Sequence, residues 1–243
     1  WKLWHVANLR PHTVGILLEV QSVDLNRTGC GKQLSGKNLD GGVIGFCGGS
    51  GIDAIFATCA EHFGPLSIGW QPLPLKIFWP KSEIYAIDAC APVLRYAFSR
   101  SNDLNTAINF YQKDAESTGF KSNSFDLITS SMFLHEIPQK NLKNIGKEIF
   151  RLLKPHGVML HNEQPQYHGV SPVEQFFREW DTWYNNEPMR CAFRDMDLVR
   201  WAENSGFKKQ NIVQKIAPGA SYIKEKIRTF GDGTWFIFSS LKN

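Results

Sequence analysis

The chain has 243 residues, of which 42% are hydrophobic and 13% aromatic, and its formal net charge is +4. This size and composition suit one large α/β domain with an ample core. Basic and acidic residues are mixed, without a basic run interleaved with aromatics, and no apolar stretch reaches the roughly 18–20 residues of a membrane span. The sequence therefore predicts neither a nucleic-acid partner nor a membrane span.

The five cysteines are scattered and odd in number, and no two of them form a CxxC pair. This usage is typical of reduced thiols in a cytoplasmic protein. The chain starts at Trp1 rather than Met, as a fragment or a trimmed chain would. Residues 1–41 give no clear pattern, and we treat them as an N-terminal extension without an assigned role. The remaining residues, 42–243, are predicted to form a single domain.

A strand, a glycine-rich turn and a helix open this domain. Residues 43–46 form a short apolar run that predicts a buried parallel strand. Gly49 and Gly51 follow, and apolar residues then recur at helical spacing over residues 52–63. Glycines let the backbone approach a ligand closely, and a helix N-terminus offers free N–H groups. This unit is typical of nucleotide-binding α/β folds.

Residues 64–79 interrupt the regular pattern. They contain Pro65, Pro72 and Pro74 and show neither a helical nor a strand period. Without these sixteen residues, the preceding helix would join the next strand by an ordinary short connection. We therefore predict an insertion loop at 64–79.

A second strand is predicted over residues 84–87 and ends in Asp88. An acidic residue at this strand end accepts hydrogen bonds from ribose hydroxyls in nucleotide-binding units, about 20 residues after the glycines. Asp88 lies 37 residues after Gly51, or 21 if the sixteen residues of the predicted insertion are left out. A helix-capping role for Asp88 is the alternative. Pro92 then predicts the start of the next helix.

Three more strands and a helix follow in alternation. Strands are predicted at 107–111, 125–129 and 158–161, and a helix at 139–153. Ligands of open α/β sheets bind at the carboxyl ends of the strands. Ser130, His135 and Glu136 follow the strand at 125–129, so they lie where chemistry is expected.

The C-terminal part contains a predicted lid at 164–192. Its helix carries apolar residues up to Trp180 and Tyr184 at helical spacing and ends near Asn185. The helix suits either a cap over an acceptor pocket or ordinary packing. A further helix at 196–204 and strands at 212–216 and 235–239 complete the chain.

Three metal-ligand residue types, His161, Glu163 and His168, lie near the end of the strand at 158–161. Their spacing matches no strong metal motif. We therefore expect a polar pocket rim there and no metal site.

Five segments in order resemble the motifs of class I S-adenosylmethionine-dependent methyltransferases, and more narrowly the type 11, small-molecule methyltransferase domain. The resemblance covers about residues 42–163. Its motifs are residues 43–51, Asp88 with Pro92, Asp114 with Ala115, residues 125–138 and residues 151–157.

The resemblance implies a Rossmann-like, mostly parallel sheet of seven strands, with helices on both faces and an antiparallel last hairpin. It implies S-adenosylmethionine as the cofactor and a small molecule as the methyl acceptor. The cofactor-binding residues expected from it are Gly45, Cys47, Gly49, Gly51, Asp88, Ala89, Asp114, Ala115 and Ser130. The expected acceptor-binding residues are Glu136, Glu163, Trp180, Tyr184 and Asn185.

Methyl transfer from a sulfonium mainly needs orientation and a dry site, and a base is needed only if the acceptor is protonated. His135 is the candidate catalytic base, because an imidazole titrates near neutral pH. A structural role for His135 in closing the strand-to-helix turn is the alternative.

Two other functions stay open. Residues 49–54 satisfy G-x-G-x-x-A, which also suits an NAD(P)-dependent oxidoreductase. The methyltransferase family usually has an acidic residue at the position of Gly45 and a glycine at that of Cys47. These departures, together with the predicted insertion at 64–79, motivate the alternative of a methyltransferase-like module that has lost its cofactor site and is not an enzyme.

Overall fold

The computed structural model describes residues 42–46, 72–78, 80–168, 170–217 and 235–243. Within them, seven strands form one sheet in the order β3-β2-β1-β4-β5-β7-β6. The strands are β1 (Gly42–Phe46), β2 (Ile84–Asp88), β3 (Asn109–Gln112), β4 (Phe125–Ser131), β5 (Leu153–Glu163), β6 (Ile212–Ala217) and β7 (Trp235–Leu241).

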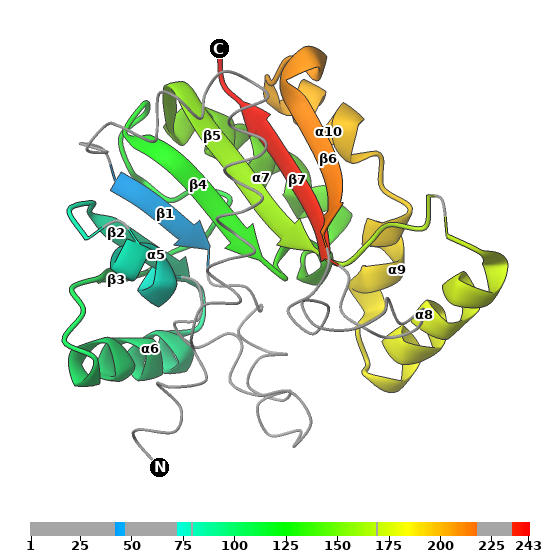
Figure 1. The fold of residues 1–243 in the computed structure, drawn as a ribbon, viewed down its shortest axis with the longest axis horizontal. Coiled ribbons are helices and arrows are strands. Elements are labelled where there is room, and N and C mark those ends of the chain that lie inside the picture. The colour runs from blue at the N-terminus through cyan, green and yellow to red at the C-terminus, as the bar shows by residue number, and fades with distance from the viewer. Residues whose placement is uncertain (1–41, 47–71, 79, 169, 218–234) are drawn as a thin grey trace.

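The five strands from β3 to β5 are parallel, and β7 runs antiparallel to both of its neighbours, β5 and β6. The chain winds outward from β1 to β3 and then crosses to β4 on the other side of β1. In open α/β sheets, such a reversal is where a ligand-binding crevice forms, beyond the carboxyl ends of the strands, which here are β1 and β4. Figure 1 shows the arrowheads of β1, β4 and β5 directed to the same edge of the sheet. The predicted α/β class is confirmed.

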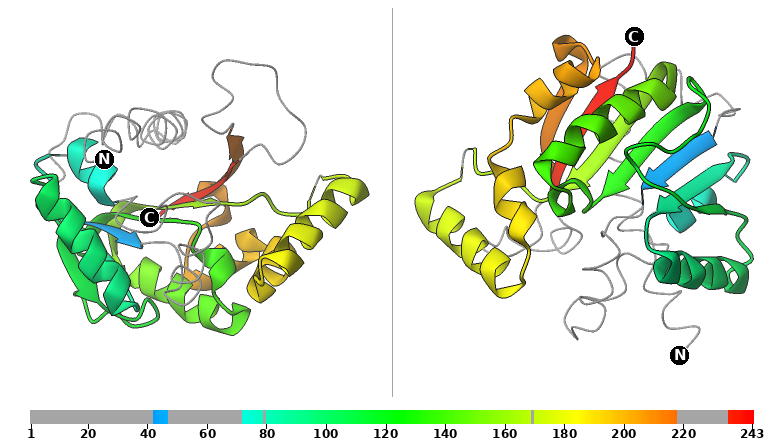
Figure 2. Two further views of the ribbon diagram at one scale, coloured as in Figure 1. Left: turned by 90° about the horizontal axis from the view of Figure 1, so that it is seen from below. Right: turned by 180° about the vertical axis from the view of Figure 1, so that it is seen from behind.

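The helices are α5 (Pro72–Phe78), α6 (Ala91–Asp103), α7 (Gln139–Leu152), α8 (Pro172–Tyr184), α9 (Pro188–Arg194) and α10 (Leu198–Ser205). Two short 3-10 turns, η1 (Leu134–Glu136) and η2 (Lys209–Asn211), complete the elements. Figure 2 shows α5 on one face of the sheet and α7 with α10 on the other, so helices cover both faces.

The core lies mainly between α7, α10 and the sheet. Helix α7 buries Leu142, Ile145, Ile149 and Leu152 on one face, as its helical spacing predicts. Trp201 of α10 packs into this layer, and its Nε1–H donates to the carbonyl of Leu142 over 2.8 Å. The apolar layer thus fixes α7 beneath the strands whose ends form the crevice.

The prediction of an insertion loop at 64–79 is wrong for the part that the structure describes. Residues 72–78 form helix α5, which packs against β2 and buries Leu73 and Leu75. The two leucines lie two residues apart in a helix of about two turns, which is too short for a helical period to be recognised. The rest of this segment, like the predicted helix at 52–63 and residues 1–41, lies outside the described residues.

Other predicted elements are found with small shifts of their boundaries. Strand β3 begins two residues later than predicted, and β5 begins five residues earlier, because Leu153 already pairs with Phe125. Gly206 ends α10 with a φ of 118°, a left-handed value that glycine adopts without strain. Helix α9 was not predicted.

Candidate functional site

The candidate site lies at the carboxyl ends of β2, β4 and β5. Asp88 ends β2, Ser130 and Ser131 end β4, and Glu163 ends β5. The 3-10 turn η1 follows β4 after two residues, so it brings His135 and Glu136 to the same edge. The parallel register places these strand ends beside one another, since Ser130 pairs with both Phe46 and His161.

Asp88 is buried at the end of β2, and one of its oxygens has no hydrogen-bond partner among the residues that the structure describes. Its Oδ1 accepts a 2.7 Å hydrogen bond from the N–H of Cys90, whereas Oδ2 is buried without a hydrogen bond. Burial raises the pKa of Asp88 from 3.8 to about 6, although the N–H groups of Cys90 and Ala89 favour the ionised form. Asp88 therefore offers a free acceptor at the position predicted for a ribose contact.

The loop after β3 holds the residues expected near the adenine. Asp114 Oδ1 accepts from the N–H of Glu116 over 2.8 Å and closes a tight turn. Ala115 packs against the core beside this turn. Ala89 accepts from Gln112 Nε2 over 3.0 Å, which ties the end of β3 to the end of β2. The structure thus brings Ala89 and Asp114 onto adjoining strand ends.

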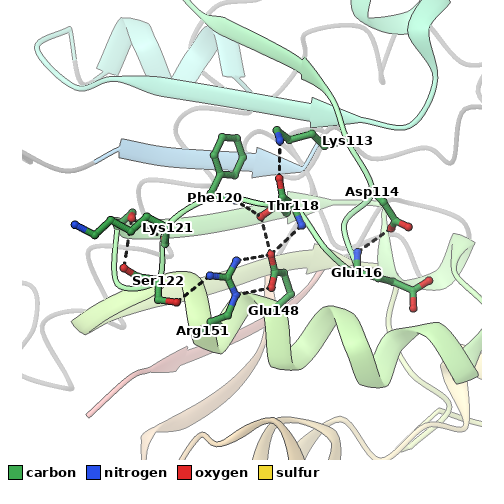
Figure 3. Close-up of polar contacts among 10 residues, drawn as sticks. Lys113, Asp114, Glu116, Thr118, Phe120, Lys121, Ser122, Glu148 and Arg151 are labelled. Carbon is green, nitrogen blue, oxygen red and sulfur yellow. Dashed lines mark hydrogen bonds and ion pairs between the residues drawn. The ribbon is translucent and has the colours of Figure 1, made fainter.

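A polar network centred on the buried pair Thr118 and Glu148 anchors this loop to α7 (Figure 3). Thr118 donates to Glu148 Oε1 through its N–H and its hydroxyl, over 2.9 and 2.6 Å. Arg151 donates to both oxygens of Glu148, and its Nη1 reaches Ser122 Oγ. Lys113 Nζ donates to the Thr118 carbonyl over 2.6 Å. This network gives the loop that carries Asp114 a fixed position relative to the sheet.

The glycine-rich turn can be located only in part. Gly45 lies within β1, where it pairs with Ala86 on one side and Thr129 on the other. Cys47, Gly49 and Gly51 lie outside the described residues, so their predicted contacts with a cofactor stay predictions.

Ser130, expected to contact the cofactor, bonds within the protein instead. Its hydroxyl and His161 Nδ1 share a 2.6 Å hydrogen bond between β4 and β5. Burial lowers the pKa of His161 from 6.5 to about 4, so the ring is neutral near pH 7. This pair fastens the two strand ends together, and its members are both fully buried.

Glu163 holds the turn that carries the candidate base. Its Oε1 accepts from the N–H groups of Phe133 and Leu134 over 2.9 and 2.6 Å. Its Oε2 lies 2.6 Å from His135 Nδ1. Both oxygens have protein partners and none of the side chain is exposed, so Glu163 holds this turn in place, and its contact with an acceptor stays a prediction. The ion pair also supports the structural alternative for His135, that it closes the turn.

His135 is 1% exposed and lies between two carboxylates. Burial by itself would lower its pKa, but Glu163 and Glu136 outweigh this effect, and the net shift is upward. Its Nε2 lies 3.3 Å from Glu136 Oε1 and makes no hydrogen bond of good geometry. Because Glu163 engages Nδ1, Nε2 is the ring nitrogen that a ligand could contact, through either its lone pair or its proton.

A second layer of charge from α8 and α9 covers this turn. Arg190 of α9 pairs with Asp181 Oδ2 over 2.7 Å and with Glu187. Helix α9 packs directly on η1. One imidazole nitrogen of His135 and one carboxylate oxygen each of Glu136 and Glu187 all lie within 4.8 Å of one another. The sequence analysis assigned no role to Glu187 or Arg190. Their i,i+3 spacing, with Pro188 between them, is the signal that could have identified them as a pair.

The residues expected on an acceptor-binding lid are not gathered with this buried cluster. Trp180 and Tyr184 stack on each other with ring centroids 5.4 Å apart, and they are 47% and 78% exposed. Asn185 donates from Nδ2 to Asp181 Oδ1 at the end of α8. Figure 1 shows α8 projecting from the body of the domain. Its aromatic face is available to an acceptor or another partner, but it does not line the turn around His135.

His161, Glu163 and His168, which were predicted to form a polar pocket rim, each have a separate environment in the structure. His161 bonds to Ser130, Glu163 bonds to His135, and His168 is exposed.

Among the residues that the structure describes, no helix combines the length and apolar character needed to cross a bilayer.

Part of the chain is similar to known methyltransferases. Residues 68–161 match the family model described as a methyltransferase domain. Over 112 residues, the chain is 31% identical to the demethylmenaquinone methyltransferase of Lactiplantibacillus plantarum. This match covers 44% of the chain and 46% of that relative, so it spans about half of the relative's length.

Solved structures share the fold. A SAM-dependent methyltransferase from Methanosarcina mazei superposes with a TM-score of 0.54 at 17% identity, covering 84% of this chain and 92% of that one. Phosphoethanolamine N-methyltransferase 2 of Haemonchus contortus, in complex with S-adenosyl-L-methionine, gives 0.54 at 16% identity, covering 87% of this chain and 50% of that one. The family match over residues 68–161 and the shared fold agree, and both make this chain similar to methyltransferase domains.

Proposed function

We propose that the protein transfers a methyl group from S-adenosylmethionine to a small-molecule acceptor. The observation that carries this proposal is Asp88, which combines burial at the end of β2 with an oxygen that lacks a hydrogen-bond partner. A buried carboxylate oxygen without a partner is costly, and a ribose hydroxyl would supply the missing donor. The adjoining turn at Asp114 lies where the adenine would extend, and the crevice between β1 and β4 would take the methionine end.

When bound, S-adenosylmethionine supplies an electrophilic methyl group, so the protein needs to bind, orient and exclude water. Asp88 would fix the ribose, and the anchored loop carrying Asp114 would fix the position of the adenine. His135 would act as the base if the acceptor is protonated, because Nδ1 is engaged by Glu163 and only Nε2 is left to take a proton. Glu136, beside Nε2, would face the acceptor.

The compound named for the bacterial relative, demethylmenaquinone, is the first acceptor to test. The exposed aromatic face of α8, with Trp180 and Tyr184, would provide apolar contact area for such a molecule. We also propose a cytoplasmic location without a nucleic-acid partner, in line with the free thiols of Cys90 and Cys191.

The test is isothermal titration of the full chain with S-adenosylmethionine, S-adenosylhomocysteine and NADH. We expect both adenosyl compounds to bind and NADH not to bind. Asp88→Asn keeps the size of the side chain but removes the charge, and should weaken binding by about 10- to 100-fold, the effect of losing one charged hydrogen bond. Asp103→Asn, on the exposed end of α6, is the matched control and should leave binding unchanged.

Each other result points to a different function. Binding of NADH alone would establish the oxidoreductase alternative. Failure of a folded sample to bind any of the three compounds would favour the non-catalytic module, for which Gly45 and Cys47 are the motivating residues.

A further inference from the structure

We propose that His135, Glu136 and Glu187 form a binding site for a divalent transition-metal ion such as Zn²⁺. One ligand atom from each residue lies within 4.8 Å of the other two. Imidazole nitrogen and carboxylate oxygen are the ligand types that Zn²⁺ accepts at about 2.0–2.2 Å. Three protein ligands leave a fourth position for water or another small ligand.

The first argument is the geometry around Nε2 of His135. Two tetrahedral ligands of Zn²⁺ are separated by roughly 3.4 Å, given those bond lengths. His135 Nε2 and Glu136 Oε1 are 3.3 Å apart, which matches this spacing without rearrangement. The wider separation to Glu187 would close by rotation about the bonds of its flexible side chain, which belongs to the residue just before α9.

The second argument concerns the burial of His135. The side chain is 1% exposed, and among the described residues its Nε2 makes no hydrogen bond, the nearest acceptor being Glu136 Oε1 at 3.3 Å. A buried ring nitrogen without a hydrogen bond is uncommon in folded proteins, because the lost interaction with water is not replaced. A metal ion would supply the missing partner.

The third argument is the fixed orientation of the imidazole. Glu163 is fully buried, and its Oε2 lies 2.6 Å from His135 Nδ1. A histidine that binds a metal commonly donates its other N–H to a carboxylate, which fixes the ring and increases its basicity. Glu163 is itself held by the N–H groups of Phe133 and Leu134. The Glu163 carboxylate therefore already orients the His135 ring so that its other nitrogen, Nε2, is available to a metal ion.

Arg190 is the competing cation at this site. Its guanidinium pairs with Glu187 and also with Asp181, at 2.7 Å. Arg194, also buried, adds a second guanidinium close to Arg190. The three carboxylates of Glu136, Glu163 and Glu187 still exceed these two positive charges when the His135 ring is neutral, so a metal ion would have to replace the proton that the carboxylates favour on His135. Metal binding would require Glu187 to be shared with Arg190 or turned away from it, while Asp181 continues to hold the guanidinium.

The metal site and the proposed base would use the same lone pair on Nε2. A metal-loaded protein would therefore lack this base, and that regulatory consequence rests on the proposed function. The binding of metal does not rest on it, because none of the three ligands is a residue assigned to S-adenosylmethionine. The two proposals can consequently fail separately.

The test uses the full chain after treatment with EDTA and removal of the chelator. Titration with Co²⁺ should produce the visible absorption bands of a low-symmetry site, and titration calorimetry with Zn²⁺ should give one site per chain. His135→Gln and Glu187→Gln should each weaken Zn²⁺ binding by at least about tenfold and remove the Co²⁺ bands. His168→Gln and Glu203→Gln, both at exposed positions, are the matched controls and should behave like the unmodified chain.

Circular dichroism checks that every variant is folded, and Glu136→Gln takes the place of His135→Gln if that variant does not fold. Absence of Zn²⁺ binding in the folded, unmodified chain would overturn the proposal. Binding that is equally strong in His135→Gln and Glu187→Gln would also overturn it, because the ion would then sit elsewhere. A separate titration with S-adenosylmethionine tells a failed metal site from a failed cofactor site.

Discussion

His135 Nδ1 and Glu163 Oε2 lie 2.6 Å apart and join the turn after β4 to the end of β5. Glu163 also accepts the N–H groups of Phe133 and Leu134, so one buried carboxylate holds three groups of the same turn. The position of the candidate base is therefore set by a residue that lies 28 positions later in the chain.

We expect Glu163→Ala to destabilise the protein strongly. The change would leave two backbone N–H groups and the His135 ring without their buried partner, a loss of about 3–5 kcal/mol. Urea denaturation followed by circular dichroism measures the difference. Glu203→Ala, on the exposed side of α10, should stay within about 0.5 kcal/mol of the original chain. A loss below 1 kcal/mol for Glu163→Ala would contradict the positioning role.

The raised pKa of Asp88 predicts a stability that falls as pH rises. The folded state binds this proton more tightly than the unfolded chain, since the pKa is about 6 in the fold against an ordinary 3.8. Stability is therefore highest below the ordinary value and is lost between the two, by up to about 3 kcal/mol. Asp88→Asn cannot ionise, so it should be more stable than the original chain at neutral pH and similar to it at low pH.

The measurement is the urea midpoint of both chains from about pH 4 to about pH 7, with Asp103→Asn as the control. Parallel pH profiles for the original chain and Asp88→Asn would show that Asp88 does not carry the unfavourable charge. The gain in stability should come with the weakened cofactor binding proposed above.

His161 should remain neutral well below its ordinary pKa. Its pKa is lowered to about 4 in the fold, whereas the unfolded chain takes up a proton near 6.5. The unfolded state thus binds more protons in this window, and stability should fall as the pH drops from 6.5 towards 4. Nuclear magnetic resonance of the ring nitrogens at pH 5.5 measures the charge state directly. A protonated His161 ring at that pH would contradict the prediction.

Gly146 should not tolerate a larger residue. A Cβ at this position would lie 3.0 Å from atoms of the Trp201 ring and closer still to Ser205 Oγ, so α7 and α10 would have to separate. Overpacking of this kind costs about 1–3 kcal/mol. Gly146→Ala should lower the thermal midpoint despite the better helix propensity of alanine, and Lys147→Ala, on the exposed face, should not. An unchanged midpoint for Gly146→Ala would show that the two helices have room to adjust.

The regular elements were largely predictable because their signals are local. The apolar stripe of α7 and the glycine that ends α10 depend on residues one or two turns apart, and both were found. Helix α5 was missed because seven residues with two prolines carry too short a period. The early start of β5 was missed because Leu153 is placed in the sheet by Phe125, which lies far from it in sequence.

The candidate site likewise has features that the sequence could predict and features that it could not. The sequence by itself determined that Asp88, His135 and Glu136 follow strands, because strand ends can be recognised from apolar runs. It did not determine which of them would be engaged by the protein. Ser130, expected to contact a cofactor, bonds to His161, and Glu163, expected to contact an acceptor, holds a turn, whereas the ligand contacts of both stay predictions.

Only the tertiary structure decided which polar groups at the sheet edge are already satisfied. Hydrogen bonds between β4 and β5, and between η1 and β5, join residues about 30 positions apart, a distance over which sequence spacing gives no signal. The grouping of Glu187 with His135 likewise depends on α9 packing against η1. Strand and helix formation follow from neighbours in the chain, whereas the free oxygen of Asp88 and the open nitrogen of His135 follow from contacts made on folding.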